Sequence, residues 1–219
     1  MKTALSLLLC LLLIACAAAP ATPHWQLATH TALNQFVAAY LEGDSRLAQI
    51  YLTRARSEAA KSGRADGLGQ IELTRCALRV ASLDYDDCPE FAPLAADAAA
   101  AQSAYADFLR GHWETLEFDR LPPQHRRYPR QTAEEIELSE IDDPLARLVA
   151  ASVLLRVGRL HPSQIEVIVE TAADQGWRRP LLAWLGIQKQ RAAADPETQA
   201  KIRRRIERIT QTRKPEIQR

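Results

Sequence analysis

Residues 25–63 contain two helical apolar patterns separated by one short turn, WQLATHTALNQFVAAYLEGDSRLAQIYLTRARSEAAKSG. In each pattern apolar side chains recur every three or four positions, which is the period of one helix face. They are Ala28, Ala32, Phe36, Ala39 and Tyr40 in the first segment, and Leu47, Ala48, Tyr51, Leu52, Ala55 and Ala59 in the second. Gly43 and Asp44 supply a helix stop and a new N-cap, and Gly63 lies beyond the second helix. Helices joined by so short a turn must lie antiparallel, so the sequence predicts a helical hairpin.

The turn and the second helix of this hairpin resemble a tetratricopeptide repeat. With Gly43 as the small residue between the helices, Ala48, Leu52 and Ala55 fall at the spacings where that repeat has small, large and small residues. The small residues let two helices approach closely, and the large one fills the space between them. The resemblance covers this hairpin only, and it implies a helical repeat architecture.

The helical period continues along the rest of the chain. It predicts a third helix and a fourth helix, marked respectively by Leu73, Cys76, Ala77, Val80 and Ala81, and by Leu94, Ala98, Ala101, Tyr105 and Phe108. Asp143-Pro144 combines a capping side chain with proline at the first helical position, before an almost wholly apolar helix over 145–155. Further helices begin at Pro162, Pro180 and Pro196. The predicted fold is all-α, with antiparallel helical hairpins stacked as a short tetratricopeptide-like solenoid or as two small helical bundles.

The helical period is lost between Asp119 and Thr132. Residues 121–130 read LPPQHRRYPR, with three prolines and three arginines, which is typical of a boundary. The predicted divisions are a signal peptide (1–16), a tether (17–23), an N-terminal helical region (24–118), a Pro/Arg-rich linker (119–131), a C-terminal helical region (132–212) and a tail (213–219).

The first sixteen residues are typical of a secretion signal. Lys2 precedes an apolar run over 4–15, which is shorter than the about 20 residues of a membrane-spanning helix. The run closes with Leu13-Ile14-Ala15-Cys16, which resembles the lipobox of bacterial lipoproteins. In that family the cysteine receives a diacylglyceryl group, the preceding peptide is removed and the new amino terminus is acylated. The resemblance implies lipidation at Cys16, and the alternative is an ordinary secretory signal cleaved after residues 17–19.

The same resemblance implies a location. Ala17 follows the cysteine, and it is not the Asp that marks lipoproteins for retention in the inner membrane, so we expect a lipid anchor in the outer membrane at its periplasmic face. The tether over 17–23 reaches only about 20–25 Å at roughly 3.3 Å per residue. The folded part must therefore lie close to the membrane.

The charge balance excludes one class of partner. Removal of residues 1–16 takes away Lys2 and no acidic residue, so 27 of the 28 Lys and Arg remain against 27 Asp and Glu. A formal charge of zero gives no overall attraction to polyanions, so we predict no nucleic-acid partner.

Two cysteines remain once Cys10 leaves with the signal and Cys16 carries lipid. These are Cys76 and Cys88, and in an oxidising compartment we expect them to form a disulfide that joins the third helix to the start of the fourth. The alternative is a buried free Cys76 with an exposed Cys88. No Cys-x-x-Cys occurs, which argues against a thioredoxin-like redox site.

One string resembles a catalytic segment. Gly67-Leu68-Gly69-Gln70-Ile71 is similar to the Gly-Leu-Met-Gln segment of lytic transglycosylases, a family that needs a preceding acidic Glu, usually followed by Ser. Here Ser57-Glu58 has the reverse order and Met is missing, so we interpret the string as a helix start. Glu72 is expected to form a solvated ion pair with Arg75 one turn along the helix.

Other catalytic and metal-binding patterns are missing from the sequence. The five histidines have no metal-ligand spacing, and the acidic turn 84–87 lacks the glycine of a calcium loop. There is no Gly-rich phosphate loop and no Gly-x-Ser-x-Gly elbow. We therefore predict no metal, no cofactor and no enzymatic activity.

Two basic segments are candidate surfaces for a partner or an anion. They contain Arg126, Arg127 and Arg130 in the predicted linker, and Arg203, Arg204 and Arg208 in the last helix. The expected function is a membrane-anchored periplasmic lipoprotein that serves as a non-enzymatic helical scaffold or adaptor for a protein partner in the cell envelope. The alternatives are a peptidoglycan-acting enzyme and a binder of an anionic envelope ligand.

Overall fold

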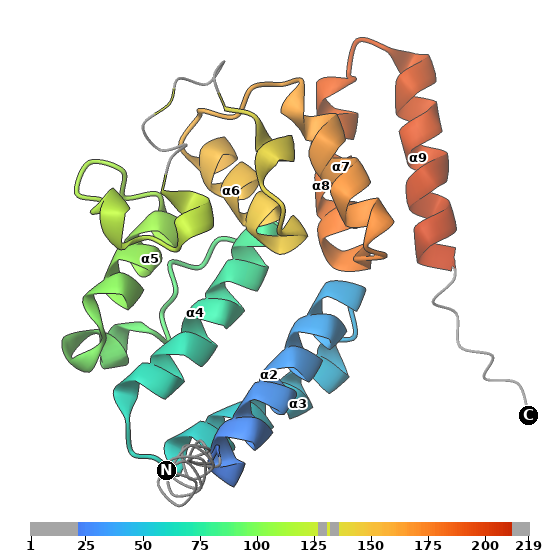
Figure 1. The fold of residues 1–219 in the computed structure, drawn as a ribbon. Coiled ribbons are helices and arrows are strands. Elements are labelled where there is room, and N and C mark those ends of the chain that lie inside the picture. Colours follow the sequence, from blue (N-terminus) through green and yellow to red (C-terminus); the bar gives the residue numbers. More distant parts are fainter. Residues whose placement is uncertain (1–21, 127–130, 132–135, 212–219) are drawn as a thin grey trace, which may run out of the picture.

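The computed structural model describes residues 22–126, 131 and 136–211. Within these ranges every regular element is a helix and no strand occurs, which confirms the all-α prediction. The α-helices are α2 (His24–Glu42), α3 (Ser45–Ala60), α4 (Ala65–Ala81), α5 (Ala100–Arg110), α6 (Pro144–Arg156), α7 (Gln164–Asp174), α8 (Arg178–Arg191) and α9 (Pro196–Gln211). Short 3-10 helices lie at Ala92–Asp97, Phe118–Arg120, Pro123–His125 and Leu138–Glu140. In Figure 1, α4 and α6 lie in the middle, while α5 and α9 lie at opposite edges.

The predicted hairpin is formed by α2 and α3. Gly43 ends α2 in the left-handed region, with φ 86°, where a side chain would be strained. Asp44 then caps α3, because its Oδ1 accepts a hydrogen bond from the Leu47 backbone N–H at 3.0 Å. Ala48, Leu52 and Ala55, the residues of the repeat-like spacing, are buried. The turn chemistry and the small residues of α3 therefore form the close antiparallel pair that the sequence predicts.

The hydrophobic core divides along α4, which is buried on two sides. Ile71 and Leu78 belong to a smaller cluster with α2 and α3. Leu73, Cys76 and Val80 belong to a larger cluster that continues into α5, α6, α7, α8 and α9. Helix α4 therefore joins the hairpin to the rest of the molecule.

The predicted linker over 119–131 is packed against this core in the part that the structure describes. Leu121 and His125 are buried, and the His125 ring lies 4.9 Å from the Phe108 ring. The larger cluster contains residues from both predicted helical regions, so the core does not divide at this segment. Proline removes the helical period here, but it does not prevent an apolar or an uncharged side chain from being buried.

The predicted fourth helix is shorter than expected. Its apolar pattern begins at Leu94, but the structure places a 3-10 helix there and extended backbone at Ala98 and Ala99, and α5 begins only afterwards. The side chain of Gln102 accepts a hydrogen bond from the Ala99 N–H at 3.3 Å and donates one to the Asp66 carbonyl at 2.8 Å. This bridge holds the start of α5 against the start of α4.

Helix α6 is central to the larger cluster, as its apolar sequence predicts. Asp143 caps it by accepting a hydrogen bond from the Ala146 N–H at 2.6 Å, and Pro144 occupies the first turn. All residues over 148–154 are buried. Helix α6 packs against α4, α5 and α7.

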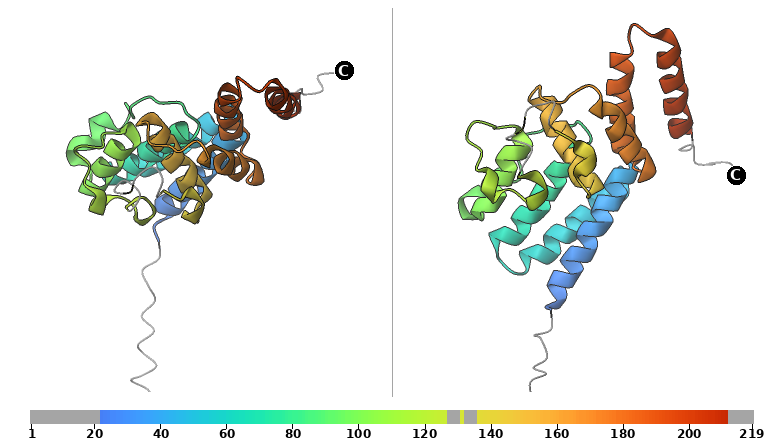
Figure 2. Two further views of the ribbon diagram at one scale, coloured as in Figure 1. Left: turned by 90° about the horizontal axis from the view of Figure 1, so that it is seen from above. Right: turned by 45° about the horizontal axis from the view of Figure 1, so that its top comes forward.

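Helix α9 is the most peripheral element. It packs on α8 and stands apart from the other helices in both views of Figure 2. Ile202 is its one buried residue, whereas the α8 residue Trp184 is fully buried and donates from Nε1 to the Ala81 carbonyl at 3.2 Å. The core therefore holds α8 firmly and leaves most of α9 in solvent. A search of the described residues found no helix with the length and apolarity needed to cross a membrane.

Candidate binding groove between α3 and α4

An ion pair joins α3 to α4 at the middle of their antiparallel contact. Arg56 donates from Nε and Nη2 to the two carboxylate oxygens of Glu72, and both distances are 2.6 Å. Glu72 is 6% exposed, and this two-point pair compensates the cost of burying its charge. The hydrogen bonds that Arg56 donates to Glu72 raise the pKa of the Arg56 guanidinium. The predicted solvated pair between Glu72 and Arg75 is wrong, because Glu72 turns inward to α3.

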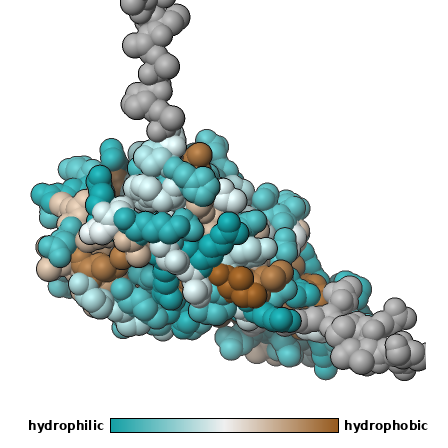
Figure 3. All heavy atoms as spheres, turned by 90° about the horizontal axis from the view of Figure 1, so that it is seen from below, coloured by the Kyte–Doolittle hydropathy of each residue, from teal (hydrophilic) through white to brown (hydrophobic). Residues whose placement is uncertain are grey.

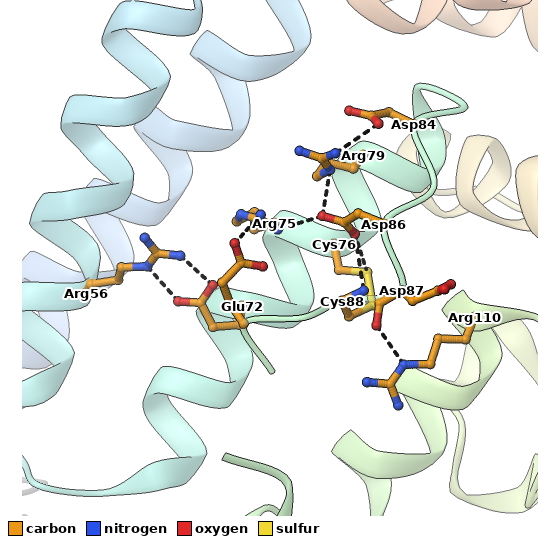
Figure 4. A network of polar contacts seen from close by, with 11 residues as sticks. Arg56, Glu72, Arg75, Cys76, Arg79, Asp84, Asp86, Asp87, Cys88 and Arg110 are labelled. Atoms are coloured by element: carbon orange, nitrogen blue, oxygen red, sulfur yellow. Dashed lines mark hydrogen bonds and ion pairs between the residues drawn. A yellow bond between two sulfur atoms is a disulfide. The ribbon is translucent and has the colours of Figure 1, made fainter. Parts of the chain in front are cut away.

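Arg75 and its neighbour Arg79 point instead at the acidic turn after α4 (Figure 4). Arg75 contacts Asp86 at 3.2 Å and Glu90 at 2.5 Å. Arg79 lies 2.9 Å from Asp84, and its Nε lies 2.8 Å from Asp86 without directing its N–H at the oxygen. The carboxylates of the turn are therefore neutralised by arginines of α4.

The predicted disulfide between Cys76 and Cys88 is confirmed, with Cα atoms 5.3 Å apart. Both cysteines are 1% exposed. The Cys88 N–H also donates to Asp86 Oδ1 at 3.2 Å, and Asp87 and Cys88 both have positive φ values, which are uncommon for residues with side chains. The covalent bond therefore holds an unfavourable backbone turn against α4.

The far side of the turn is fixed to α5 and α6. Tyr85 donates its hydroxyl to the Ser152 carbonyl at 2.9 Å, and burial raises the pKa of Tyr85 to about 12. Arg156 lies 2.5 Å from an Asp87 oxygen, while Arg110 donates to the Asp87 carbonyl at 2.9 Å. With its carboxylates engaged in this way, the turn is a rigid structural element. The described residues contain no group of three ligands that could hold a metal ion.

Two separate hollows open beside α3 and α4, and we call the surface that carries both of them the α3–α4 groove. The first, which we call the Glu90 hollow, has a volume of about 430 Å³. Its walls include Arg56, Ala60, Leu68, Glu72, Glu90 and Leu94. The second, the Arg179 hollow, has a volume of about 290 Å³. Its walls include Tyr40, Gln49, Arg75, Arg79, Asp84 and Arg179.

The two hollows have different unsatisfied polar groups. Glu90 Oε2 is buried and has no hydrogen-bond partner among the described residues. Arg179 donates to the Tyr40 carbonyl at 2.7 Å and to the Ser45 hydroxyl at 2.9 Å, and its guanidinium lies 4.2 Å from the Tyr40 ring centroid. These acceptors are neutral, so the positive charge of Arg179 has no ion-pair partner in the described part of the chain.

A third cavity, of about 510 Å³, lies between α4, α5, residues 120–126 and the start of α6. Tyr105, His125 and Asp143 line it. Desolvation lowers the pKa of His125 to about 3, so its imidazole is uncharged at neutral pH. The Tyr105 ring stacks on His125 with centroids 5.8 Å apart, and burial raises the pKa of the Tyr105 hydroxyl. The His125 imidazole and the Tyr105 hydroxyl are therefore both uncharged near pH 7, and their rings pack against each other.

The residues that resemble a transglycosylase segment have structural positions. Gly67 to Ile71 form the first turns of α4, which confirms their interpretation as a helix start. Glu58 lies on α3 and contacts Lys61 at 2.7 Å, and this hydrogen bond lowers the pKa of Glu58. A general acid for glycoside cleavage needs a raised pKa, so the shift has the wrong direction.

Of the basic residues predicted as a partner surface, the structure describes Arg126 and the three arginines of α9. Arg126 donates from Nε to the Leu121 carbonyl at 2.6 Å, which holds its side chain against its own loop. Arg203, Arg204 and Arg208 are exposed on α9, at the edge opposite α5 in Figure 1. Cys16, Arg127 and Arg130 lie outside the described residues.

The residues of the candidate groove that the sequence did not reveal are Arg56, Glu90 and Arg179. They lie on α3, in the loop before the 3-10 helix at 92–97, and on α8, and no motif links such distant positions. No protein-family model matches the chain, and no similar curated protein or solved structure was found.

Proposed function

We propose that this protein is a lipid-anchored periplasmic lipoprotein of the outer membrane, attached through Cys16, and that it serves as a non-enzymatic helical scaffold for a protein partner. The lipobox-like sequence 13–16 supports the anchor, and the short tether 17–23 keeps the helices near the membrane. The α3–α4 groove supports the docking function. In this proposal the folded helices present the groove, and the anchor restricts where a partner meets it.

The observation that carries this function is the pair of hollows beside Arg56–Glu72. An open groove with buried, incompletely paired polar groups is suited to side chains supplied by another molecule, because each such group gains a hydrogen bond or an ion pair on binding. The disulfide and the arginines around Asp86 hold one wall rigid, which lowers the entropy cost of binding.

The rest of the surface favours a polar groove over a broad apolar interface. On the face drawn in Figure 3, apolar side chains form separate patches among hydrophilic ones. Large aliphatic residues that are exposed in the described chain are Leu27 on α2 and the neighbouring Leu47 and Ile50 on α3. So few exposed apolar residues are normal for a folded domain and do not define a docking site.

Site-specific photocrosslinking in living cells tests the proposal. A benzophenone amino acid is placed at Gln49, Thr53 or Ser57, which lie on α3 beside the groove, and at Glu166 on α7 as a control. We expect one crosslinked protein from the groove positions and none from the control. Crosslinking to the same proteins from all four positions, or from none, would contradict a specific groove.

A second candidate function, binding to an anionic envelope surface, is favoured by one observation on α9. Arg203, Arg204 and Arg208 are exposed and make no ion pair within the described residues. Replacing all three by Gln tests this candidate through cosedimentation with phosphatidylglycerol vesicles. The protein used is residues 22–219 without the lipid anchor, which we call the soluble domain. If α9 binds the anionic surface, the variant sediments less than the wild type at low salt.

A further inference from the structure

We infer that the occupant of the α3–α4 groove inserts a lysine side chain into the Glu90 hollow and an acidic side chain into the Arg179 hollow. This inference rests on the proposed docking function and adds the chemistry of the partner. It follows from the incompletely paired charged group in each hollow, Glu90 in one and Arg179 in the other.

The Glu90 hollow fits a cation on an aliphatic stem. Arg75 already occupies Glu90 Oε1 at 2.5 Å, which leaves Oε2 as the one oxygen of this carboxylate without a hydrogen-bond partner among the described residues, on a side chain that is 41% exposed as a whole. Leu68 and Leu94 supply apolar walls beside this oxygen. A lysine packs its methylene groups on such walls and brings one compact ammonium to one oxygen. Arginine is less suited, because its planar fork pairs best with two free carboxylate oxygens.

The Glu90 hollow offers a cation one unpaired carboxylate oxygen and no excess negative charge, because Arg56 pairs with Glu72 and Arg75 pairs with Glu90. Glu72 and Glu90 line it together with one arginine, Arg56, and the coulombic effect of Glu90 contributes to raising the pKa of that arginine. Arg56 directs Nε and Nη2 at Glu72. A second positive group beside Glu90 Oε2 would therefore meet an acceptor that no described residue uses.

The Arg179 hollow instead contains a positive charge without an ion-pair partner among the described residues. Asp84 lines it, but Asp84 is held by Arg79 at 2.9 Å. Arg75 is engaged by Asp86 at 3.2 Å and by Glu90 at 2.5 Å. Arg179 therefore remains as a cation bonded only to neutral acceptors, and a carboxylate in this hollow would complete an ion pair with it.

Small probes test the two hollows separately. Amide NMR spectra of the soluble domain are recorded during titration with n-butylammonium, with ethylguanidinium and with propionate. We expect n-butylammonium to shift Leu68 and Leu94 with a Kd of about 1–10 mM, as befits a ligand of few atoms. Propionate should instead shift Gln49 and Arg179. Ethylguanidinium should bind the Glu90 hollow more weakly than n-butylammonium.

Substitutions assign each response to its charged group. Glu90→Gln should weaken n-butylammonium binding at least about tenfold and leave propionate unchanged, whereas Glu166→Gln, at an exposed position on α7, should change neither. Arg179→Gln should abolish the propionate shifts, and Arg179→Lys should restore them. An otherwise wild-type spectrum shows that each variant is folded.

The outcomes distinguish failure of this side-chain assignment from failure of the proposed docking function. No saturable shift with n-butylammonium or propionate, tighter binding of ethylguanidinium, or equal loss in Glu90→Gln and Glu166→Gln would overturn the assignment of side chains. Specific groove crosslinks together with any of those results would leave the docking function intact. Probe binding at the assigned residues without groove crosslinks would instead refute docking in cells.

Discussion

Arg56 and Glu72 lie sixteen residues apart in the chain and meet through two hydrogen bonds of 2.6 Å each. The Arg56 side chain is one-third exposed and the Glu72 side chain is 7% exposed, so the pair lies at the boundary between the core and the groove. It ties the hairpin helix α3 to α4 and lines the Glu90 hollow. Stability and binding therefore depend on the same contact.

Arg56→Met should destabilise the protein by about 2–3 kcal/mol, because it leaves the buried Glu72 carboxylate without its partner. The partial exposure of Arg56 keeps the loss at the low end for a buried pair. The double variant Arg56→Met/Glu72→Met should lie within about 1 kcal/mol of wild type, since no unpaired charge remains. Urea unfolding followed by circular dichroism measures all of these values.

The matched control for that series is Lys61→Met, which removes the surface pair with Glu58. Its effect should stay below about 1 kcal/mol. A loss in Arg56→Met no larger than that in Lys61→Met would show that the Arg56–Glu72 pair does not hold α3 against α4.

Replacing Cys76 and Cys88 together by Ala should lower the free energy of unfolding by about 3 kcal/mol through loop-closure entropy. The double replacement avoids a free thiol. Thiol labelling of denatured, unreduced wild-type protein should modify neither cysteine, and urea unfolding gives the stability difference. Labelling of both cysteines would contradict the disulfide in the natural protein.

Cys16→Ser should leave an unlipidated precursor, because serine offers no thiol to receive the diacylglyceryl group. Mass spectrometry of the amino-terminal peptide from membranes should find a lipid-modified cysteine in the wild type. An unmodified Cys16 would refute the anchor, and a mature terminus after residues 17–19 would instead indicate an ordinary secretory signal.

His125 should make stability fall as the pH falls below about 6.5. Burial holds its folded-state pKa at about 3, against an ordinary value of 6.5, so between these values the unfolded chain binds a proton that the folded chain does not. The loss amounts to at most about 1.4 kcal/mol per pH unit. His125→Phe should flatten this dependence between pH 6 and pH 4 relative to wild type, as measured by urea unfolding. Equal slopes for the two proteins would show that His125 is protonated in the folded state.

Neither Glu58→Gln nor Glu72→Gln should alter any activity on peptidoglycan. Lys61 lowers the pKa of Glu58, and Arg56 occupies both oxygens of Glu72, so neither carboxyl group is placed to give a proton to a glycosidic oxygen. The measurement is release of muropeptides from purified sacculi by the soluble domain. Release by the wild type that either substitution abolishes would favour the enzyme over the scaffold.

The helix ends, the helix caps and the helical class of this protein can be predicted from its sequence alone. Gly43 and Asp44 ended one helix and capped the next, Asp143 and Pro144 began α6, and the helical periods predicted an all-α fold. The cysteine count predicted the disulfide. These features depend on residues a few positions apart, or on there being one possible pairing, so a single sequence is sufficient to read them.

The contacts between side chains far apart in the chain follow from the packing of the helices and cannot be read from the sequence. Glu72 could pair with Arg75 one turn away, yet the packing of α3 on α4 brings Arg56 to it and turns Arg75 toward Asp86. The burial of the Pro/Arg-rich segment and the division of the core along α4 were likewise not visible in the helical period. Periodicity shows which face of a helix is apolar, but not which helix covers it or in what register. The register of α3 against α4 depends on the close packing of small side chains such as Ala55 and Ala59. That register sets which residues of the two helices line each hollow.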